Sequence, residues 1–249
     1  MKVLTDGDIV AYRCAATVDS TMEKDVAFYR MDVLLQQILE ATEADQQEVW
    51  LTGSDNFRKV VYPEYKANRK DTVPPCYLQD CREYLVANHK AKVSHGCEAD
   101  DMLGVNQTDD TIIATIDKDL LMIPGKHYNW VKMTIKTVPY LDGLKHFYKQ
   151  MLIGDRSDNV IGVNRVGPVK AEKYITPLDN EQDMLDVVCE LYNDPSRFIM
   201  NAACLWIQQK EEKQTWMTHA KQVGLILNSE LQQGAEAMLN FMKSLKETT

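Results

Sequence analysis

The chain has 249 residues, of which 45% are hydrophobic and 26% are charged, and its formal net charge is −9. A chain of this length forms one large domain or two small ones around a sizeable core. The negative charge argues against a basic protein that simply coats nucleic acid, and the apolar runs are far shorter than the roughly 20 residues that cross a bilayer. Asp6 and Asp8 stand where a signal peptide needs an apolar run, so we expect a cytoplasmic protein.

Strands and helices are predicted to alternate along the first half of the chain. Four runs favour strands and three stretches have helical patterns: strands at residues 2–5, 48–52, 91–94 and 111–115, and helices at residues 24–46, about 75–89, and 98–106. This alternation predicts an α/β fold with a central, mostly parallel sheet flanked by helices. Ligands of such sheets bind beyond the carboxyl ends of the strands.

The sequence pattern changes after about residue 138. Residues 139–153 look helical, Pro168 suits the first position of a helix, and residues from 181 onward place Met, Leu and Trp at helical spacing. We therefore predict an α/β core at residues 1–138 and a mostly helical part at residues 139–249.

The six cysteines are scattered without a close pair, which predicts reduced thiols rather than a disulfide framework. A zinc site could be assembled from cysteines and histidines between residues 76 and 97. The spacing of these residues fits no usual zinc motif, so we expect thiols and surface histidines instead: Cys76, Cys81, His89, His95 and Cys97.

Acidic residues follow each predicted strand end. Three strands are followed by TDGD, TGSD and TIDKD, and two further acidic segments read CEADD (97–101) and GDRSD (154–158). We expect nine acids from these five segments to converge on one sheet edge: Asp6, Asp55, Glu98, Asp100, Asp101, Asp117, Asp119, Asp155 and Asp158.

Single segments allow simpler interpretations, because acids also cap helices and Asp117 and Asp119 could form an ordinary turn. For the whole set, mutual repulsion would oppose folding unless cations lie among the acids. Oxygen ligands without His or Cys favour Mg²⁺ or Mn²⁺, and so many carboxylates exceed the needs of one ion, so we expect two. Without these nine acids the formal charge rises from −9 to 0, so the remaining surface is not acidic.

The most cationic stretch is FRKVVYPEYKANRK, residues 57–70. If a helix follows Pro63, Lys66 shares one face with Arg69 and Lys70. Tyr65 lies among them and offers a flat face on which a base can stack. A solvated helix face would carry the same residues, but the position directly after the TGSD segment favours a role at a developing phosphate charge.

Five segments together resemble the 5′-nuclease superfamily in their order and spacing: TDGDIVAYR, YPEYKANRK, CEADDMLG, IDKDLLMIPG and GDRSDNVIGVNRVGPVKA. The chain is similar to bacteriophage 5′→3′ exonucleases and flap endonucleases, and to the 5′-nuclease domain of bacterial DNA polymerase I. The resemblance covers roughly residues 1–175. The combination of EADD, DKD and GDRSDN with the glycine-rich stretch after it is highly specific.

The resemblance implies two carboxylate-bound metal sites, and a helix–three-turn–helix element at about residues 145–175 that grips duplex DNA. The first metal group would be Asp6, Asp55, Glu98, Asp100 and Asp101, and the second would be Asp117, Asp119, Asp155 and Asp158. Lys66 and Arg69 match the catalytic cationic pair of the family, and Tyr65 matches its stacking aromatic residue. The phosphate backbone would be held by Gly162, Val163, Gly167 and Lys170, and the same hairpin is a candidate K⁺ site.

The leading hypothesis is therefore Mg²⁺-dependent hydrolysis of duplex DNA at 5′ ends, nicks or flaps, in the cytoplasm of an infected bacterial host if a phage encodes the chain. One metal-bound water would attack phosphorus while the second ion stabilises the leaving 3′ oxygen. RNA–DNA hybrids, as in replication primers, and replication proteins are candidate partners. The stretch after Arg69 is short, so any arch over the site is modest, which leaves exonuclease action and flap threading as open alternatives.

Three other functions use part of the same pattern. A haloacid-dehalogenase-like phosphatase would use Asp6 as nucleophile and Asp8 as general acid, but it leaves the CEADD segment and the hairpin unexplained. A non-catalytic protein that binds DNA structures would not need the complete acid set. A PIN-type ribonuclease shares the acidic sheet edge but normally lacks the hairpin that grips DNA.

Overall fold

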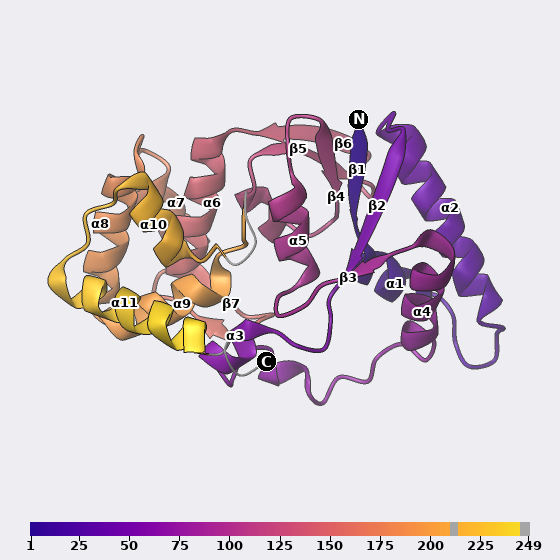
Figure 1. Ribbon diagram of the computed structural model, residues 1–249, viewed down its shortest axis with the longest axis horizontal. Helices are drawn as coiled ribbons and strands as arrows, with labels where there is room; N and C mark the ends of the chain where they lie inside the picture. Colours follow the sequence, from indigo (N-terminus) through magenta and orange to yellow (C-terminus); the bar gives the residue numbers. More distant parts are fainter. Residues whose placement is uncertain (210–213, 245–249) are drawn as a thin grey trace. The chain divides into compact units, whose positions relative to one another are not determined.

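The computed structural model describes residues 1–209 and 214–244, which form two compact units (Figure 1). Of the described residues, the first unit contains 1–56, 71–139 and 208–209. The second contains 57–70, 140–207 and 214–244. The basic stretch 57–70 therefore packs with the helical residues, although it lies within the range 1–138 assigned to the α/β core from the sequence.

A six-stranded sheet forms the centre of the first unit, in the order β3-β2-β1-β4-β5-β6. All neighbouring strands are parallel except β5 and β6, which form an antiparallel pair. The mostly parallel sheet predicted from the alternating pattern is confirmed. The bounds are β1 Lys2–Asp6, β2 Gln46–Leu51, β3 Lys92–Val93, β4 Thr111–Ala114, β5 Gly125–Asn129 and β6 Thr134–Val138.

Helices pack on this sheet because alternate strand residues are apolar on both faces. Val3 and Ile112 belong to one buried cluster with residues of α1, α2 and α4, while Leu4 and Ile113, which alternate with them, are also fully buried. Helix α5 packs on β1 and β2. The bounds are α1 Gly7–Ala15, α2 Asp25–Ala41, α4 Leu78–His89, α5 Ala99–Asn106 and the 3₁₀ turn η2 Asp119–Met122.

The described residues of the second unit are mainly helical. Its α6 ends in a short antiparallel hairpin of β7 and β8, and α7 begins at Pro168 as expected. The edge-to-face rings of Phe147 and Trp206, and of Phe198 and Trp216, form its core. The bounds are α3 Phe57–Val61, η1 Ala67–Arg69, α6 Tyr140–Ile153, β7 Gly154–Asp155, β8 Val160–Ile161, α7 Pro168–Ile175, α8 Glu181–Tyr192, α9 Pro195–Leu205, α10 Trp216–Val223 and α11 Ser229–Ser244.

The cysteines are free thiols, in agreement with the prediction of no disulfide framework. Burial raises the pKa of Cys14 and of Cys81 to about 11 and that of Cys189 to about 12, so these three are protonated and unreactive at neutral pH. Within residues 1–209 and 214–244, no helix is long and apolar enough to span a bilayer.

Arg58 ties the start of the basic stretch to the end of α9. Its side chain is 2% exposed, its Nε donates to the carbonyl of Cys204 at 2.8 Å, and its Nη2 donates to the carbonyl of Trp206 at 2.8 Å. Carbonyls at a helix C-terminus have no partner within the helix and carry partial negative charge. The guanidinium therefore satisfies these carbonyls and fixes residues 57–70 in the second unit.

We expect Arg58→Met to lower the free energy of unfolding by about 2–4 kcal/mol, because it leaves buried carbonyls without their donor. Urea unfolding followed by circular dichroism measures the change. The control Lys59→Met alters an exposed neighbour and should shift stability by less than about 0.5 kcal/mol. Equal effects of the two substitutions would contradict the anchoring role of Arg58.

Candidate active site

Strands β2, β1 and β4 of the first unit are parallel neighbours (Figure 1), and acidic residues lie at or shortly after their carboxyl ends. Asp6 ends β1, Asp55 follows β2, and Asp117 and Asp119 follow β4. Because β2, β1 and β4 are adjacent and parallel, these acids follow the same edge of the sheet. Glu98 immediately precedes α5, which packs on β1 and β2.

Asp6 is a buried acid of this edge whose pKa is strongly raised. It is 2% exposed, accepts the Ile9 N–H at 3.1 Å as the N-cap of α1, and accepts the Thr115 hydroxyl at 3.0 Å. Burial, followed by repulsion from Asp8 and then from Asp117, raises its pKa from 3.8 to about 7. The edge therefore carries more negative charge than its own hydrogen bonds neutralise.

Asp8 is neutralised by a residue that sequence reasoning did not identify. Its carboxylate pairs with the guanidinium of Arg82 on α4 and accepts the Thr52 N–H at 2.9 Å. Arg82 also donates to the Thr52 carbonyl, and the Thr52 hydroxyl accepts the N–H of Ala99 at 2.9 Å. Arg82 thus links α1 to the end of β2. An arginine 74 positions from its partner leaves no local sequence signal.

The acids of α5 act as helix caps, which was the simpler interpretation of this segment. Glu98 and Asp101 form a capping box, in which Asp101 accepts the Glu98 N–H at 3.0 Å. The other oxygen of Asp101 accepts the Gln208 N–H at 3.0 Å, and the residue is fully buried. Asp100 is half-buried. Asp101 therefore positions the start of α5 and the segment at Gln208.

Two further acids of the edge accept hydrogen bonds from backbone N–H groups. Asp55 is exposed and accepts the Gly96 N–H at 2.6 Å, while Asp117 accepts the Asp119 N–H at 2.9 Å in a local turn. Across residues 1–209 and 214–244, no three His, Cys, Asp or Glu side chains form a group that could hold a metal ion as they stand.

The other two predicted acids lie in the second unit, in the turn between β7 and β8. Asp155 organises the turn: one of its oxygens accepts the Ser157 N–H at 2.7 Å, the Ser157 hydroxyl at 2.7 Å and the Asp158 N–H at 3.2 Å. Gln150 on α6 donates to its other oxygen at 3.3 Å. This turn presents Asp158 to the basic stretch.

The expected helix after Pro63 is wrong. Only the single 3₁₀ turn Ala67–Arg69 forms, because Lys66 has a left-handed backbone (φ 56°) and donates its N–H to the carbonyl of Asp158 at 2.9 Å. Lys66, Arg69 and Tyr65 nevertheless come together on Asp158. Tyr65 is 3% exposed, so its ring is not presented for base stacking in this arrangement.

The predicted phosphate-binding residues occupy the hairpin and the start of α7. A Cβ on Gly162 would lie 2.3 Å from the carbonyl carbon of Ile153, so this glycine allows the hairpin to approach α6. Val163 donates its N–H to Leu152 at 2.8 Å rather than outward. Gly167 is the N-cap of α7, and Lys170 caps the carbonyl of Arg165 at 3.0 Å.

Two residues of α9 hold the hairpin from the other side and were also missed. Arg197 donates to the carbonyls of Ile161 and Gly162 at 2.8 and 2.7 Å, and Asn201 donates to the carbonyl of Ile161 at 2.9 Å. These carbonyls belong to the hairpin that the resemblance names as a K⁺ site. The positive guanidinium disfavours a second cation on the same oxygens.

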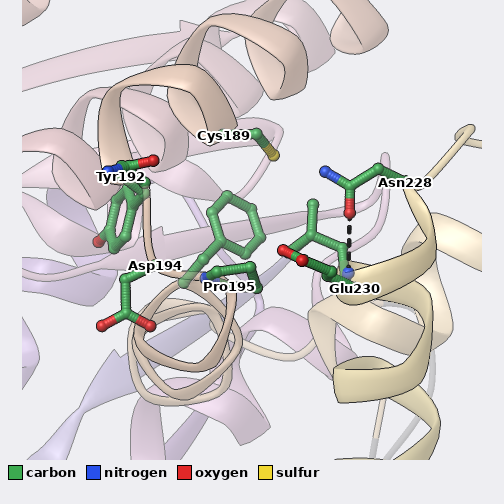
Figure 2. Close-up of a pocket in the computed structure, with 9 residues that line it drawn as sticks. Cys189, Tyr192, Asp194, Pro195, Asn228 and Glu230 are labelled. Carbon is green, nitrogen blue, oxygen red and sulfur yellow. Dashed lines mark hydrogen bonds between the residues drawn. The ribbon is translucent and has the colours of Figure 1, made fainter.

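A cavity of about 150 Å³ lies elsewhere in the second unit, between α8, α9 and the start of α11 (Figure 2). Cys189, Tyr192, Phe198 and Leu231 are among its lining residues. Asn228 at its rim accepts the N–H of Leu231 at 2.9 Å. None of the site residues predicted from the sequence lines this cavity, so it is not the candidate active site.

Known proteins are similar to this chain in sequence and in fold. A 5′-3′ exonuclease of Buchnera aphidicola is 24% identical over 237 residues, covering 86% of this chain and 82% of the relative. Flap endonuclease Xni of Shewanella piezotolerans is 29% identical over 147 residues, covering 51% of this chain, which spans only 56% of that relative. A complex of the bacteriophage T5 D15 flap endonuclease with DNA and metal ions has a TM-score of 0.66 at 16% identity, covering 96% of this chain and 98% of that one.

The structural likeness shows a common fold, and the sequence match identifies the family. Residues 1–150 match the family described as the 5′-3′ exonuclease, N-terminal resolvase-like domain. This match contains β1, β2 and β4, whose ends carry the acids of the first unit. The protein therefore belongs to the 5′-3′ exonuclease family.

Proposed function

We propose that the protein is a divalent-metal-dependent 5′ nuclease that hydrolyses phosphodiester bonds at 5′ ends, nicks or flaps of duplex DNA. The observation that carries this proposal is the row of acids at the ends of three adjacent parallel strands, within the region that matches the exonuclease family. The similar T5 flap endonuclease, whose structure contains DNA and metal ions, supports the same reaction class.

The donor set fits Mg²⁺, with Mn²⁺ as a substitute, because it consists of carboxylates. The charge balance supports this fit, since crowding with Asp8 and Asp117 adds to burial in raising the pKa of Asp6 to about 7. We assign two ions to the predicted ligands Asp6, Asp55, Glu98, Asp100, Asp101, Asp117, Asp119, Asp155 and Asp158. Bound ions would lower the pKa of a water molecule and offset negative charge on the phosphate. The capping bonds of Asp101 make it a positioning residue as well.

The remaining assigned residues bind DNA. Lys66 and Arg69 would neutralise the scissile phosphate, where their positive charge offsets the charge that develops during hydrolysis. Lys170 and the hairpin at Gly162–Gly167 would hold the phosphate backbone further along the duplex. A K⁺ ion at the hairpin stays a prediction, and Arg197 already supplies positive charge to two of its carbonyls.

RNA–DNA hybrids are proposed as further substrates, which would place the enzyme in primer removal during replication, where replication proteins would be its partners. Hydrolysis of a 5′-labelled duplex tests the reaction class. Nicked, 5′-flap, blunt and RNA-primed duplexes should release labelled products with Mg²⁺ and none with EDTA. The phosphatase alternative requires hydrolysis of p-nitrophenyl phosphate instead, and that result with intact DNA would overturn the proposal.

Substitution of the assigned ligands tests the site. Asp117→Asn and Asp158→Asn should each lower cleavage by at least about 10²-fold, because a metal ligand loses its charge, while duplex affinity measured in Mg²⁺ changes little. The control Asp110→Asn removes an exposed carboxylate directly before β4, at the opposite end of that strand, and should leave the rate unchanged. Turnover like that of the wild type in either ligand variant would exclude that residue as a ligand.

The raised pKa of Asp6 predicts a pH-dependent stability of the metal-free protein. Between its unfolded value near 4 and its folded value of about 7, Asp6 holds a proton only when folded, so the free energy of unfolding falls as the pH rises through this range. Asp6→Asn keeps the N-cap oxygen and should stabilise the protein in EDTA on the order of 4 kcal/mol at pH 8 and not at pH 4.

Thermal unfolding at the two pH values measures this difference. Added Mg²⁺ should stabilise the wild type at pH 8 more than it stabilises Asp6→Asn, because the metal relieves the same repulsion. A stabilisation of equal size at pH 4 and pH 8 would show that the substitution acts through packing and not through charge.

A further inference from the structure

Residues 62–70 and residues 154–159 of the second unit, here called the basic segment and the acidic turn, are joined by a dense set of hydrogen bonds. Asn68 and Arg69 donate to the carbonyls of Arg156 and Ser157 at 2.8 and 3.0 Å, and Asn159 donates to the carbonyl of Glu64 at 2.8 Å. These bonds use backbone acceptors, so they fix the position of the basic segment whatever the charge of the neighbouring acids.

Three side chains of the basic segment converge on the carboxylate of Asp158. The Tyr65 hydroxyl donates at 2.6 Å, Arg69 Nη2 donates at 2.8 Å, and Lys66 Nζ lies 3.7 Å from the carboxylate. The Asp158 side chain is only 18% exposed, whereas that of Arg69 is 52% exposed. The basic segment therefore surrounds the carboxylate of Asp158 with positive charge. Arg69 is already half exposed to solvent, so its guanidinium can turn away from Asp158.

In this arrangement, the proposed binding of metal by Asp158 competes with the pairing of Asp158 to Arg69 and Lys66, the two residues proposed to bind phosphate. A divalent ion on Asp158 would need the oxygens that Tyr65 and Arg69 occupy, and its charge would repel Arg69 and Lys66. While the two cations remain paired with Asp158, its negative charge offsets theirs and weakens their attraction for a phosphate. Metal binding and phosphate binding by these residues are thus linked through one carboxylate.

We propose that Arg69 and Lys66 take the place of a metal ion on Asp158 in the metal-free protein, and that a divalent ion bound there frees them for the DNA phosphate. This inference rests on the proposed function. The hydrogen bonds from the Asn68 side chain to the Arg156 carbonyl and from the Lys66 N–H to the Asp158 carbonyl would keep the freed side chains nearby. Metal and DNA then bind cooperatively, because each favours the state in which Asp158 and Arg69 are apart.

The competing arrangement is a static one, in which Arg69 contacts DNA equally well with and without metal. The two differ in how the effect of Arg69→Gln depends on the metal. With the exchange, Arg69 is engaged by Asp158 in EDTA, so its loss costs little DNA affinity there. With Mg²⁺ bound, its loss removes a charge-assisted contact to phosphate.

Fluorescence anisotropy with a 5′-phosphorylated duplex, protected by terminal phosphorothioate linkages, measures these affinities in Mg²⁺ and in EDTA at equal ionic strength. We expect Arg69→Gln to weaken binding about 10-fold in Mg²⁺ and less than about 2-fold in EDTA. The matched control Lys70→Gln, an exposed neighbour, should have the same small effect in both conditions. An equal loss for Arg69→Gln in both conditions would overturn the exchange.

A second variant, Asp158→Asn, abolishes the exchange by removing the carboxylate instead of the arginine. In Asp158→Asn, Arg69 has no carboxylate partner, so the added substitution Arg69→Gln should weaken binding by the same factor with and without Mg²⁺. A metal-dependent effect of Arg69 that persists in this background would show that Asp158 is not the shared partner, and would overturn the proposal.

Titration calorimetry with Mn²⁺ in the absence of DNA separates this inference from the function on which it rests. Arg69→Gln should bind Mn²⁺ about 2- to 5-fold more tightly than the wild type, because a competing ion pair has been removed. An unchanged or lower affinity would overturn the exchange alone. If the wild type binds no Mn²⁺ at all, the metal assignment fails and the exchange fails with it.

Discussion

Repulsion between carboxylates is the constraint that shapes both units of this protein. In the first unit, Asp8 and Asp117 lie close enough to Asp6 to add to burial in raising its pKa, and the structure neutralises Asp6 and Asp8 unequally. Asp8 receives the guanidinium of Arg82, whereas Asp6 receives only neutral donors. The remaining charge is concentrated at the deepest acid of the sheet edge, which is where a cation would gain the most electrostatic energy.

The same hydrogen bonds distinguish between the enzyme classes that the sequence left open. A phosphatase that uses Asp6 and Asp8 needs an accessible nucleophile and a proton donor. Asp6 is almost completely buried, and the carboxylate of Asp8 is already engaged by a guanidinium and a backbone N–H. The hairpin of β7 and β8 between α6 and α7 is the feature that a PIN-type ribonuclease normally lacks. Membership in the 5′-3′ exonuclease family agrees with both observations.

The sequence predicted the features that depend on repeated local patterns. Strands β1, β2 and β4, the parallel order and the helix start at Pro168 follow from apolar periodicity and turn chemistry. Helix α1 was not predicted, because Asp6 is both the last residue of β1 and the N-cap of α1, so no turn residues separate the two elements. The next residue, Gly7, lies against the backbone of Trp50, where a side chain would not fit. The hairpin of β5 and β6 was missed as well, since most residues of β6 are exposed and polar.

Contacts between distant residues could not be predicted in this way. Arg58, Arg82 and Arg197 each bind partners far away in the sequence, so neither spacing nor composition marks them. The basic segment shows the same limit. Its residues were identified from their charge, but a single left-handed residue, Lys66, replaced the expected helix and turned the side chains toward Asp158. Tertiary partners thus decided which of two local conformations formed.

The path of the chain between the two units has a consequence for dissecting the protein. Residues 57–70 leave the first unit to pack with the second, and Gln208 returns to donate its N–H to Asp101 of the first. A fragment that starts at residue 140 would lack the arginine that closes the end of α9, and a fragment that stops at residue 139 would lack the donor that Asp101 requires. A cut at this boundary therefore removes a hydrogen-bond donor from each side, and each fragment would leave buried acceptors without their partners.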